Sequence, residues 1–324
     1  MRIVFFGSGA FAVPTLESIT FDGHEVPLVV SQPDRPAGRG RQAQPTPLKE
    51  AALAEGLSVI TPQNVNAPEI VEQIRSCKAD LGYVAAFGQK IGPELLFETF
   101  PAGMINLHGS LLPALRGAAP IQWSVINGDA EAGVTVFRLV EKMDAGAILM
   151  QRRTAIGEDE TSADLHDRLA RIGCDAVRET IKLLEADPKT PGEEQDLSLV
   201  TMARKLSKQD GHIHFDMSAK ALASRINGLW SWPGARCEFQ SADGARRVEV
   251  TLARVRPYEG QNATADDDAR LGAITEMMAI QARDGAVMPL EIKPAGKKLM
   301  SWQEFVNGRH VQAGDRFVPL ESNP

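Results

Sequence analysis

The first half of the chain alternates short β-rich runs with stretches that carry apolar residues at helical spacing. The β-rich runs lie at 3–6, 26–31, 59–60, 81–86 and 103–107, and the helical stretches run to residue 19 or cover 46–56 and 68–76. Strands that alternate with helices need crossover connections, which are right-handed and give a mostly parallel sheet. The sequence therefore predicts an α/β amino-terminal domain.

The pattern changes after residue 190. Two more runs (134–139 and 147–151) and a long helical stretch at 162–185 complete the first domain, and the Pro, Gly and acidic residues at 187–194 indicate a linker. Short β-like runs punctuated by Asp-Gly and Pro-Gly turns follow, which favours a small antiparallel barrel. We expect domains at 1–189 and 207–324, joined by a linker at 190–206.

Composition limits the class of protein. The chain has 324 residues and 35 Lys+Arg against 42 Asp+Glu, so its formal charge is −7. This balance argues against indiscriminate nucleic-acid binding but leaves room for a local basic patch. The three cysteines lie far apart in the sequence, the first apolar run leaves no room for a charged leader, and no later run is long enough to span a membrane. We expect a cytoplasmic protein that does not bind membranes.

A glycine-rich segment, residues 7–12, follows the first β-rich run and matches a dinucleotide-binding fingerprint. Asp34 stands at about the distance where a ribose-binding acid is sought. The second β-rich run, however, is followed by a long basic loop at residues 32–41, whereas such a site needs a tight end of this strand. We favour the alternative that the small residues permit a close turn between strand and helix.

That basic loop carries Arg35, Arg39 and Arg41 among two prolines and two glycines, so it is too broken to form a helix. Arginine side chains on such a loop are suited to phosphate contacts. A solvated surface loop is an equally good interpretation of the loop alone.

The histidines give little indication of metal binding. His212 and His214 alternate beside Asp210 and Asp216, which is a weak signal, and the other histidines lack acidic or cysteine neighbours at ligand spacing. We expect no metal site.

The richest segment contains Asn106 and His108, at the end of the β-rich run that starts near residue 103. Alternation along a strand puts both side chains on one face, at the sheet edge where open α/β sheets bind ligands. An amide donor and a titratable imidazole are what acyl transfer needs, the first for an oxyanion and the second for protons. Asp144 precedes a flexible Ala-Gly turn, and beside His108 it would favour the charged imidazole. Each of these residues alone has an ordinary structural interpretation.

Together, these motifs resemble those of the 10-formyl-tetrahydrofolate-dependent formyltransferases. The resemblance rests on His-Gly-Ser-Leu-Leu-Pro from residue 108, Arg-Gly-Ala-Ala-Pro-Ile from residue 116 and Met-Asp-Ala-Gly-Ala-Ile-Leu from residue 143. Further similar segments begin at Gln32, Ala203 and Lys293, and they are typical of family members that act on initiator Met-tRNA. The resemblance spans nearly the whole chain.

The family resemblance implies a Rossmann-like folate-binding domain followed by an OB-like barrel that helps to hold tRNA. Catalysis is then expected from Asn106, His108 and Asp144, with no metal. The cosubstrate 10-formyl-tetrahydrofolate is expected to contact two segments, comprising Ala85, Ala86, Phe87, Gly88 and Gln89, and Ser110, Leu111, Leu112 and Pro113.

The same resemblance implies formyl transfer to the α-amino group of methionine on initiator Met-tRNA, in support of translation initiation. We expect tRNA contacts from Arg35, Arg39, Arg41, Lys205, Lys208, Lys297 and Lys298. A protonated His108 would predict a bell-shaped pH profile. We also expect a monomer.

Two alternatives and two departures stay open. Relatives that formylate a nucleotide-linked amino sugar or a glycinamide ribotide share the Asn-x-His and the later Asp, so the catalytic residues alone do not choose the acceptor. Relatives usually carry a basic and an aromatic residue where this chain has Ala114 and Leu115, and a second lysine is common at Gln42.

Overall fold

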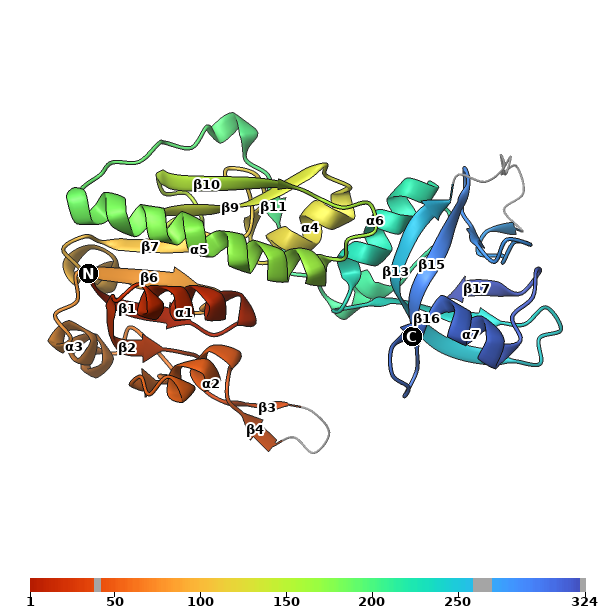
Figure 1. Ribbon diagram of the computed structural model, residues 1–324, viewed down its shortest axis with the longest axis horizontal. Coiled ribbons are helices and arrows are strands. Elements are labelled where there is room, and N and C mark those ends of the chain that lie inside the picture. The colour runs from red at the N-terminus through yellow and green to blue at the C-terminus, as the bar shows by residue number, and fades with distance from the viewer. Residues whose placement is uncertain (38–41, 259–269, 321–324) are drawn as a thin grey trace. The chain divides into compact units, whose positions relative to one another are not determined.

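A computed structural model describes residues 1–37, 42–258 and 270–320 of the chain (Figure 1). The chain forms two compact units, and it passes between them more than once. Unit 1 contains Met1–Gly117, Ala132–Thr154 and His166–Met202, and unit 2 contains Ala118–Glu131, Ala155–Leu165 and Ala203–Pro324. The domain bounds 1–189 and 207–324 stay a prediction. The compact units differ from this simple division, since residues 118–131 and 155–165 belong to unit 2.

Unit 1 is built on a seven-stranded sheet with the order β10-β9-β7-β6-β1-β2-β5. Adjacent strands from β7 to β5 are parallel, and β9 pairs antiparallel to β7. The expected mostly parallel α/β sheet is therefore confirmed. Its strands are β1 (Arg2–Gly7), β2 (Glu25–Val30), β5 (Val59–Ile60), β6 (Leu81–Ala85), β7 (Met104–His108), β9 (Glu131–Arg138) and β10 (Ile148–Ala155).

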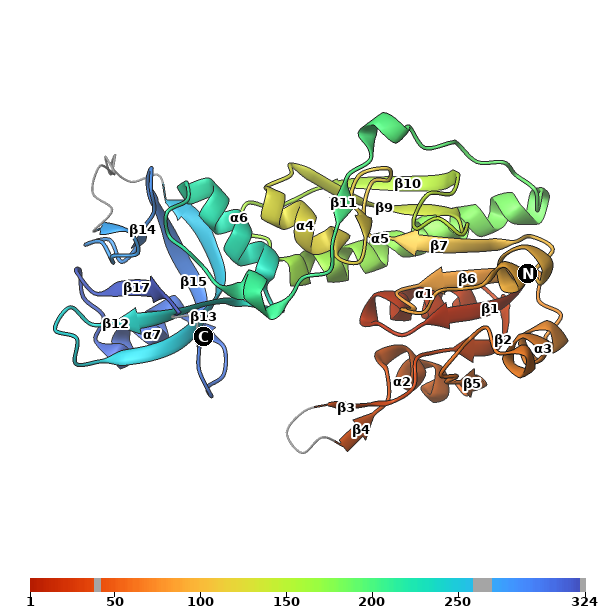
Figure 2. The same ribbon diagram turned by 180° about the vertical axis from the view of Figure 1, so that it is seen from behind.

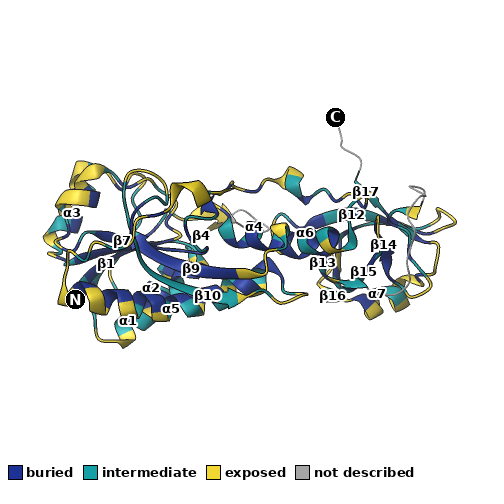
Figure 3. Ribbon diagram, turned by 90° about the horizontal axis from the view of Figure 1, so that it is seen from above, coloured by how far each residue is buried: buried dark blue, intermediate teal, exposed yellow. Residues whose placement is uncertain are grey.

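The central strands form the core of unit 1, and every residue of β1 after Arg2 is buried (Figure 3). Gly173 in α5 lets this helix approach β7 closely, because a Cβ there would lie 2.6 Å from Leu107 Cδ2. The helical segments before β11 are η1 (Ala10–Ala12), α1 (Val13–Phe21), α2 (Pro47–Ala54), α3 (Pro68–Ser76), η2 (Glu94–Glu98), α4 (Pro120–Asn127), α5 (Ser162–Ala186) and η3 (Leu197–Leu199). Of these, α4 and the start of α5 belong to unit 2.

The basic loop forms the stem of a small hairpin in unit 1 (Figure 2). Strands β3 (Arg35–Ala37) and β4 (Gln42–Gln44) pair antiparallel. Two of the arginines singled out in the sequence, Arg39 and Arg41, lie outside the described residues.

Unit 2 contains an antiparallel sheet with the order β14-β15-β13-β12-β17, to which β16 adds beside β15. Residues 272–274 connect its ends, because they bridge both to β17 and to the β14 region, which leaves a nearly closed barrel. This confirms the expected barrel. Its strands are β12 (Ala235–Gln240), β13 (Arg247–Tyr258), β14 (Ile280–Gln281), β15 (Ala286–Pro294), β16 (Met300–Ser301) and β17 (Arg316–Pro319).

The remaining elements of the described chain are short or flank the barrel. They are β8 (Arg116–Gly117), β11 (Met202–Ala203), η4 (Lys208–Gly211), α6 (Ala219–Leu229) and α7 (Trp302–Arg309). The core of the barrel contains Phe239, whose ring contacts the rings of Phe305 in α7 and Phe317 in β17.

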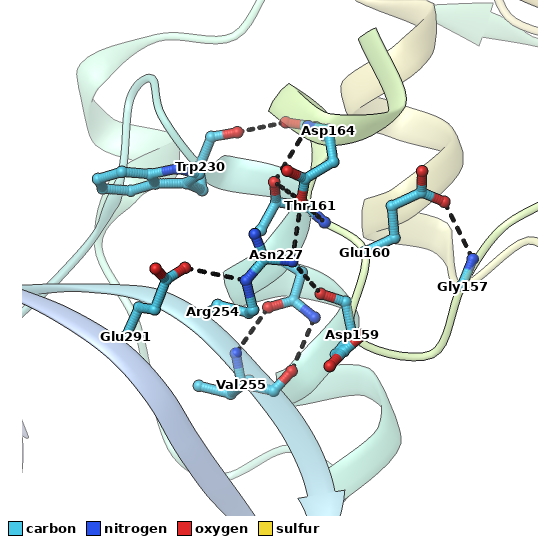
Figure 4. A network of polar contacts seen from close by, with 11 residues as sticks. Gly157, Asp159, Glu160, Thr161, Asp164, Asn227, Trp230, Arg254, Val255 and Glu291 are labelled. Atoms are coloured by element: carbon cyan, nitrogen blue, oxygen red, sulfur yellow. Dashed lines mark hydrogen bonds and ion pairs between the residues drawn. The ribbon is translucent and has the colours of Figure 1, made fainter. Parts of the chain in front are cut away.

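A polar network in unit 2 fixes the loop before α5 (Figure 4). Arg254 of β13 pairs with Asp164 at 2.9 Å and with Glu291 of β15 at 2.9 Å, and it donates to the Asp159 carbonyl. Burial opposes the charge on Asp164, yet the hydrogen bonds from Thr161 and Arg254 hold the pKa of its carboxyl below the ordinary value. The network therefore ties residues 159–164 to the barrel strands.

Candidate active site

Strand β7 carries Asn106 and His108 to the edge of the sheet in unit 1. Asn106 is paired with Val84 of β6 and Phe137 of β9, and His108, the last residue of β7, is opposite Thr135. Because residues two apart in a strand face the same side, the backbone register puts both side chains on one face. The sequence-based placement at the carboxyl end of a parallel strand agrees with this geometry.

His108 is buried and has polar neighbours on both ring nitrogens. Its Nε2 lies 3.0 Å from the Leu115 carbonyl oxygen, and its Nδ1 lies 3.9 Å from Asp144 Oδ2. Since a carbonyl only accepts hydrogen bonds, Nε2 is the nitrogen that donates, and in the neutral ring Nδ1 keeps its lone pair. The basic nitrogen of His108 therefore faces Asp144.

The protonation state of His108 differs from the sequence-based expectation. Burial lowers the pKa of the imidazole below its ordinary value of 6.5, although Asp144 and the Leu115 carbonyl both act to raise it. Burial outweighs the carboxylate because the ion pair is long, at 3.9 Å. In the free protein the neutral imidazole is favoured at neutral pH, so the expectation that Asp144 keeps His108 charged is not met.

Asp144 lies in the turn between β9 and β10. Its Oδ2 accepts a hydrogen bond of 2.8 Å from the Gly117 backbone N–H, and its own backbone has a φ of +49°. Two residues later, Gly146 is packed so closely that a Cβ would lie 1.7 Å from the Arg138 carbonyl oxygen. The turn that carries Asp144 thus requires a glycine at position 146.

Asn106 has a half-buried side chain. Within the described ranges of the chain, its amide makes no hydrogen bond to another residue. An amide on the same strand face as His108, and without a protein partner, is available to donate to a bound carbonyl oxygen.

The segment that follows β6 lies at the same sheet edge as Asn106. Ala86 and Gly88 are exposed and have φ values of +48° and +82°, whereas Ala85 and Phe87 are buried. The Gln89 side chain is used internally, because it accepts from the Val65 N–H and donates to the Pro62 carbonyl.

The glycine-rich turn at residues 7–9 packs against residues 85–87 and donates hydrogen bonds to them. Ser8 donates through its hydroxyl to the Phe87 carbonyl at 3.1 Å, and Gly9 donates through its N–H to the Ala86 carbonyl at 3.4 Å. A Cβ on Gly7 would lie 2.8 Å from the Ala85 carbonyl. The small residues therefore permit a close turn, which agrees with the structural interpretation of the fingerprint.

Residues 110–113 follow His108 and are fixed by two polar side chains from β9 and β10. Thr135 donates to the Ser110 carbonyl and accepts from the Leu112 N–H, at 2.7 and 3.1 Å. Gln151 donates to the Leu112 carbonyl and to Thr135 Oγ1. Leu111 and Pro113 stay half-buried, and the peptide between Leu112 and Pro113 is cis.

The basic residues expected to contact tRNA are exposed where the structure describes them. In unit 1, Arg35 lies on β3 and donates to Gln32. In unit 2, the exposed lysines are Lys205 and Lys208 near η4, and Lys297 and Lys298 in the turn after β15.

Two further searches concern the described part of the chain. No group of three or more His, Cys, Asp or Glu side chains there is arranged to hold a metal ion. No helix there is both long and apolar enough to cross a membrane.

Sequence reasoning missed several residues that shape this site. Thr135 and Gln151 fix the segment after His108, and Gln195 lies beside the Asp144 turn, where it accepts hydrogen bonds from Arg116, the first residue of a motif noted in the sequence. Their residue types are ordinary, and their partners lie far away in the sequence. The pairing that puts Thr135 opposite His108 becomes visible only in the sheet.

Comparisons with known proteins agree along the whole chain. The "Formyl transferase" family matches residues 1–181, and the "Formyl transferase, C-terminal domain" family matches residues 205–310. The chain is 40% identical to the methionyl-tRNA formyltransferase of Solibacter usitatus over 98% of both chains. It is also 40% identical to that of Symbiobacterium thermophilum over 99% of this chain and 97% of the relative.

Solved structures share the fold at low identity. The sugar 3N-formyl transferase WlaRD superimposes with a TM-score of 0.62 at 16% identity, over 92% of this chain and 99% of WlaRD. HypX from Aquifex aeolicus superimposes with a TM-score of 0.61 at 17% identity, and this chain covers 48% of its length. The full-length relatives, by contrast, share both domains and far higher identity, and the chain belongs to the methionyl-tRNA formyltransferase family.

Proposed function

We propose that this protein transfers the formyl group of 10-formyl-tetrahydrofolate to the α-amino group of methionine on initiator Met-tRNA. The observation that carries this function is 40% identity to methionyl-tRNA formyltransferases over nearly the full length of both chains. WlaRD and HypX share only the fold, so their acceptors do not bear on this one.

The folate would occupy the sheet edge formed by residues 85–89 and 110–113. Ala86 and Gly88 offer exposed backbone groups there, and Leu111 and Pro113 offer half-buried apolar surface for a flat ring. Because Ser110 donates its hydroxyl to the Ala114 carbonyl, its contribution is to shape the segment. Gln89 likewise supports the 85–89 segment through its internal bonds.

The reaction begins when the unprotonated amine attacks the formyl carbon. A new C–N bond forms, the carbonyl electrons move to the oxygen, and a tetrahedral oxyanion results. The Asn106 amide, which has no protein partner among the described residues, would donate to this oxygen. Such donors stabilise charge that develops only in the transition state.

The proton released by the attacking nitrogen needs a base. Neutral His108 presents Nδ1 toward Asp144, so it can accept this proton and form an imidazolium that the carboxylate stabilises. The imidazolium then returns the proton to N10 of the folate as the formyl C–N10 bond breaks. The products are formyl-methionyl-tRNA and tetrahydrofolate, and no proton is gained or lost overall.

The acceptor tRNA would bind through exposed basic side chains, which are Arg35 in unit 1 and Lys205, Lys208, Lys297 and Lys298 in unit 2. Arg39 and Arg41 belong to the same proposal on sequence grounds. Contacts to phosphates explain how a chain of charge −7 can bind RNA locally. A monomeric state and a cytoplasmic location also stay predictions.

An assay that compares two acceptors tests the proposed function. Purified protein is given 10-formyl-tetrahydrofolate labelled in the formyl group, with initiator Met-tRNA or a UDP-amino sugar as acceptor. We expect label in formyl-methionine released from the tRNA and none in the sugar. Transfer to the sugar alone would support the alternative acceptor and contradict this proposal.

A further inference from the structure

Residues 188–201, which we term the strap, follow α5 in unit 1. Their Pro, Gly and acidic residues indicate a linker, but the strap is bonded back to the unit at residues 188, 190, 193, 195 and 201. Arg138 donates to the Pro188 and Thr190 carbonyls, and Glu193 exchanges two backbone hydrogen bonds with Ile148. The strap is therefore a fixed part of unit 1.

Gln195 of the strap is buried and uses both ends of its side-chain amide. Its Oε1 accepts from Arg116 Nε and Nη2 at 3.1 and 2.6 Å. Its Nε2 donates to the Asp144 and Gly146 carbonyls at 2.9 and 2.8 Å. Gln195 therefore holds both ends of the turn that carries Asp144.

Thr201, at the other end of the strap, holds the residue that bonds to His108. Its Oγ1 accepts from the Leu115 N–H at 2.8 Å, and its carbonyl accepts from the Arg116 N–H at 2.9 Å. Leu115 in turn offers its carbonyl to His108 Nε2. One strap thus reaches the supports of both His108 and Asp144.

The two supported residues share an unusual backbone. Leu115 and Asp144 have φ values of +59° and +49°, a region that residues with a Cβ rarely adopt. Such conformations persist only where surrounding contacts hold them, and they are often found at functional sites. Thr201 and Gln195 supply such contacts at these two residues.

We propose that the strap is a positioning element of the formyl-transfer site, in which Gln195 holds Asp144 and Thr201 holds Leu115 in the conformations that their contacts with His108 require. This inference rests on the proposed function for its kinetic effect. Its structural part concerns His108 and can be measured without any substrate.

Gln195→Glu is the first test variant. It keeps the shape and an acceptor for Arg116, but it removes the N–H donor to the Asp144 and Gly146 carbonyls. If the turn moves, Asp144 loses its influence on His108, and the pKa of His108 falls further. A new negative charge without movement would raise this pKa instead, so the sign separates the two effects.

Thr201→Val is the second variant, because it removes only the hydroxyl at an exposed residue. We expect Leu115 to relax and His108 to lose its carbonyl partner, which again lowers the pKa of His108. Thr201→Ser restores the hydroxyl and should restore wild-type behaviour. For Gln195→Glu, the matched control is Gln73→Glu, at an exposed glutamine on α3.

Histidine side-chain NMR of the full chain over pH measures the pKa, with the His108 signal assigned by its loss in His108→Ala. Circular dichroism checks folding. In the formylation assay we expect kcat to fall roughly 10- to 100-fold for Gln195→Glu and about 10-fold for Thr201→Val, with KM for tRNA unchanged. Wild-type His108 pKa and kcat in both folded variants would overturn the proposal, as would a raised pKa in Gln195→Glu. If the wild type formylates no tRNA, the proposed function fails, but the NMR result still decides the strap.

Discussion

The two sides of the proposed active site are held by different kinds of structure. His108 and Asn106 lie on β7, whose backbone is paired on both sides by β6 and β9. Asp144 lies on a turn with a left-handed backbone and depends on Gly117, Gly146 and Gln195 for its place. One side follows from sheet register, and the other follows from single contacts.

This difference predicts where the site is vulnerable. A central strand moves only when many backbone hydrogen bonds and a buried core move with it, whereas a turn can shift when one contact is lost. The basic nitrogen of His108, Nδ1, lies 3.9 Å from Asp144 Oδ2. A small shift of the turn would change this distance directly, while β7 stays in place. We therefore expect substitutions on the strand to lower the rate by removing a reacting group, and substitutions near the turn to lower it by displacing Asp144.

The largest effect is expected when the strand-borne groups are removed. His108→Ala and Asn106→Ala should each lower kcat by at least ~10²–10³, because each removes a group that acts in the transition state. Thermal unfolding should stay close to wild type for Asn106→Ala, since its amide has no protein partner within the described residues. Steady-state kinetics with initiator Met-tRNA measure this, and near-normal activity in either variant would remove that residue from the catalytic set.

A somewhat smaller effect is expected on the turn side from Gly146→Ala. The new Cβ would lie 1.7 Å from the Arg138 carbonyl, so the turn must shift, and misplacement by about 1 Å can cost ~10² in rate. Asp144 itself would still be present. The control is Gly308→Ala on α7, where a Cβ meets nothing within 4 Å and activity should be unchanged. Equal activity in the two variants would show that the turn tolerates movement.

The same contrast separates what the sequence predicted from what it did not. The apolar run before Asn106 predicted β7, because side-chain alternation is local to a strand. The order of strands and helices along the chain then predicted its place at the sheet edge. Gln195 and Thr201 gave no signal, since their partners lie up to 86 residues away in the chain. The sequence indicated the raising influence of Asp144 on the pKa of His108, but it did not reveal the burial that outweighs it.

The barrel shows the same limit in the second unit. Strand β15 continues without a break from Ala286 to Pro294 although it contains Pro289, and the register of β13 is irregular opposite this proline. The residues of β12 alternate regularly between buried and half-buried. That alternation was present in the sequence, whereas the closure of the barrel through residues 272–274 depends on tertiary pairing.

A titration of His108 tests how strongly Asp144 acts on it, and the variant used, Asp144→Asn, keeps the size of the side chain. We expect the pKa of His108 in the free protein to lie below 6.5, because burial outweighs Asp144. Asp144→Asn removes the largest raising influence, so the pKa should fall further. Histidine NMR measures both, and a wild-type pKa above 6.5 would contradict the neutral His108 of the proposed mechanism.

The pH dependence of the rate follows from that direction. Since His108 acts as a base in its neutral form, kcat/KM should be lost as the pH falls through the lowered pKa, and protonation of the amine adds to this loss at low pH. Above that range His108 is already neutral and keeps its Nε2 proton, so it causes no alkaline fall. The profile should therefore rise to a plateau, in place of the bell shape predicted from a charged His108.

The smallest effects on chemistry are expected from the lysines that we propose to contact tRNA, because none of them belongs to the proposed catalytic set. Lys205→Ala and Lys208→Ala should raise KM for tRNA several-fold and leave kcat unchanged, because phosphate contacts fix position and do not enter the bond-forming step. Each lost phosphate contact should also reduce the salt slope of tRNA binding by about 1. Affinity measured from low to moderate salt tests this, and a wild-type slope in the double variant would exclude both lysines from phosphate contact. A lowered kcat in the lysine variants would instead mean that phosphate binding helps to place the amine, and the bound tRNA would then join the fixed strand and the adjustable turn as a part that positions the reacting groups.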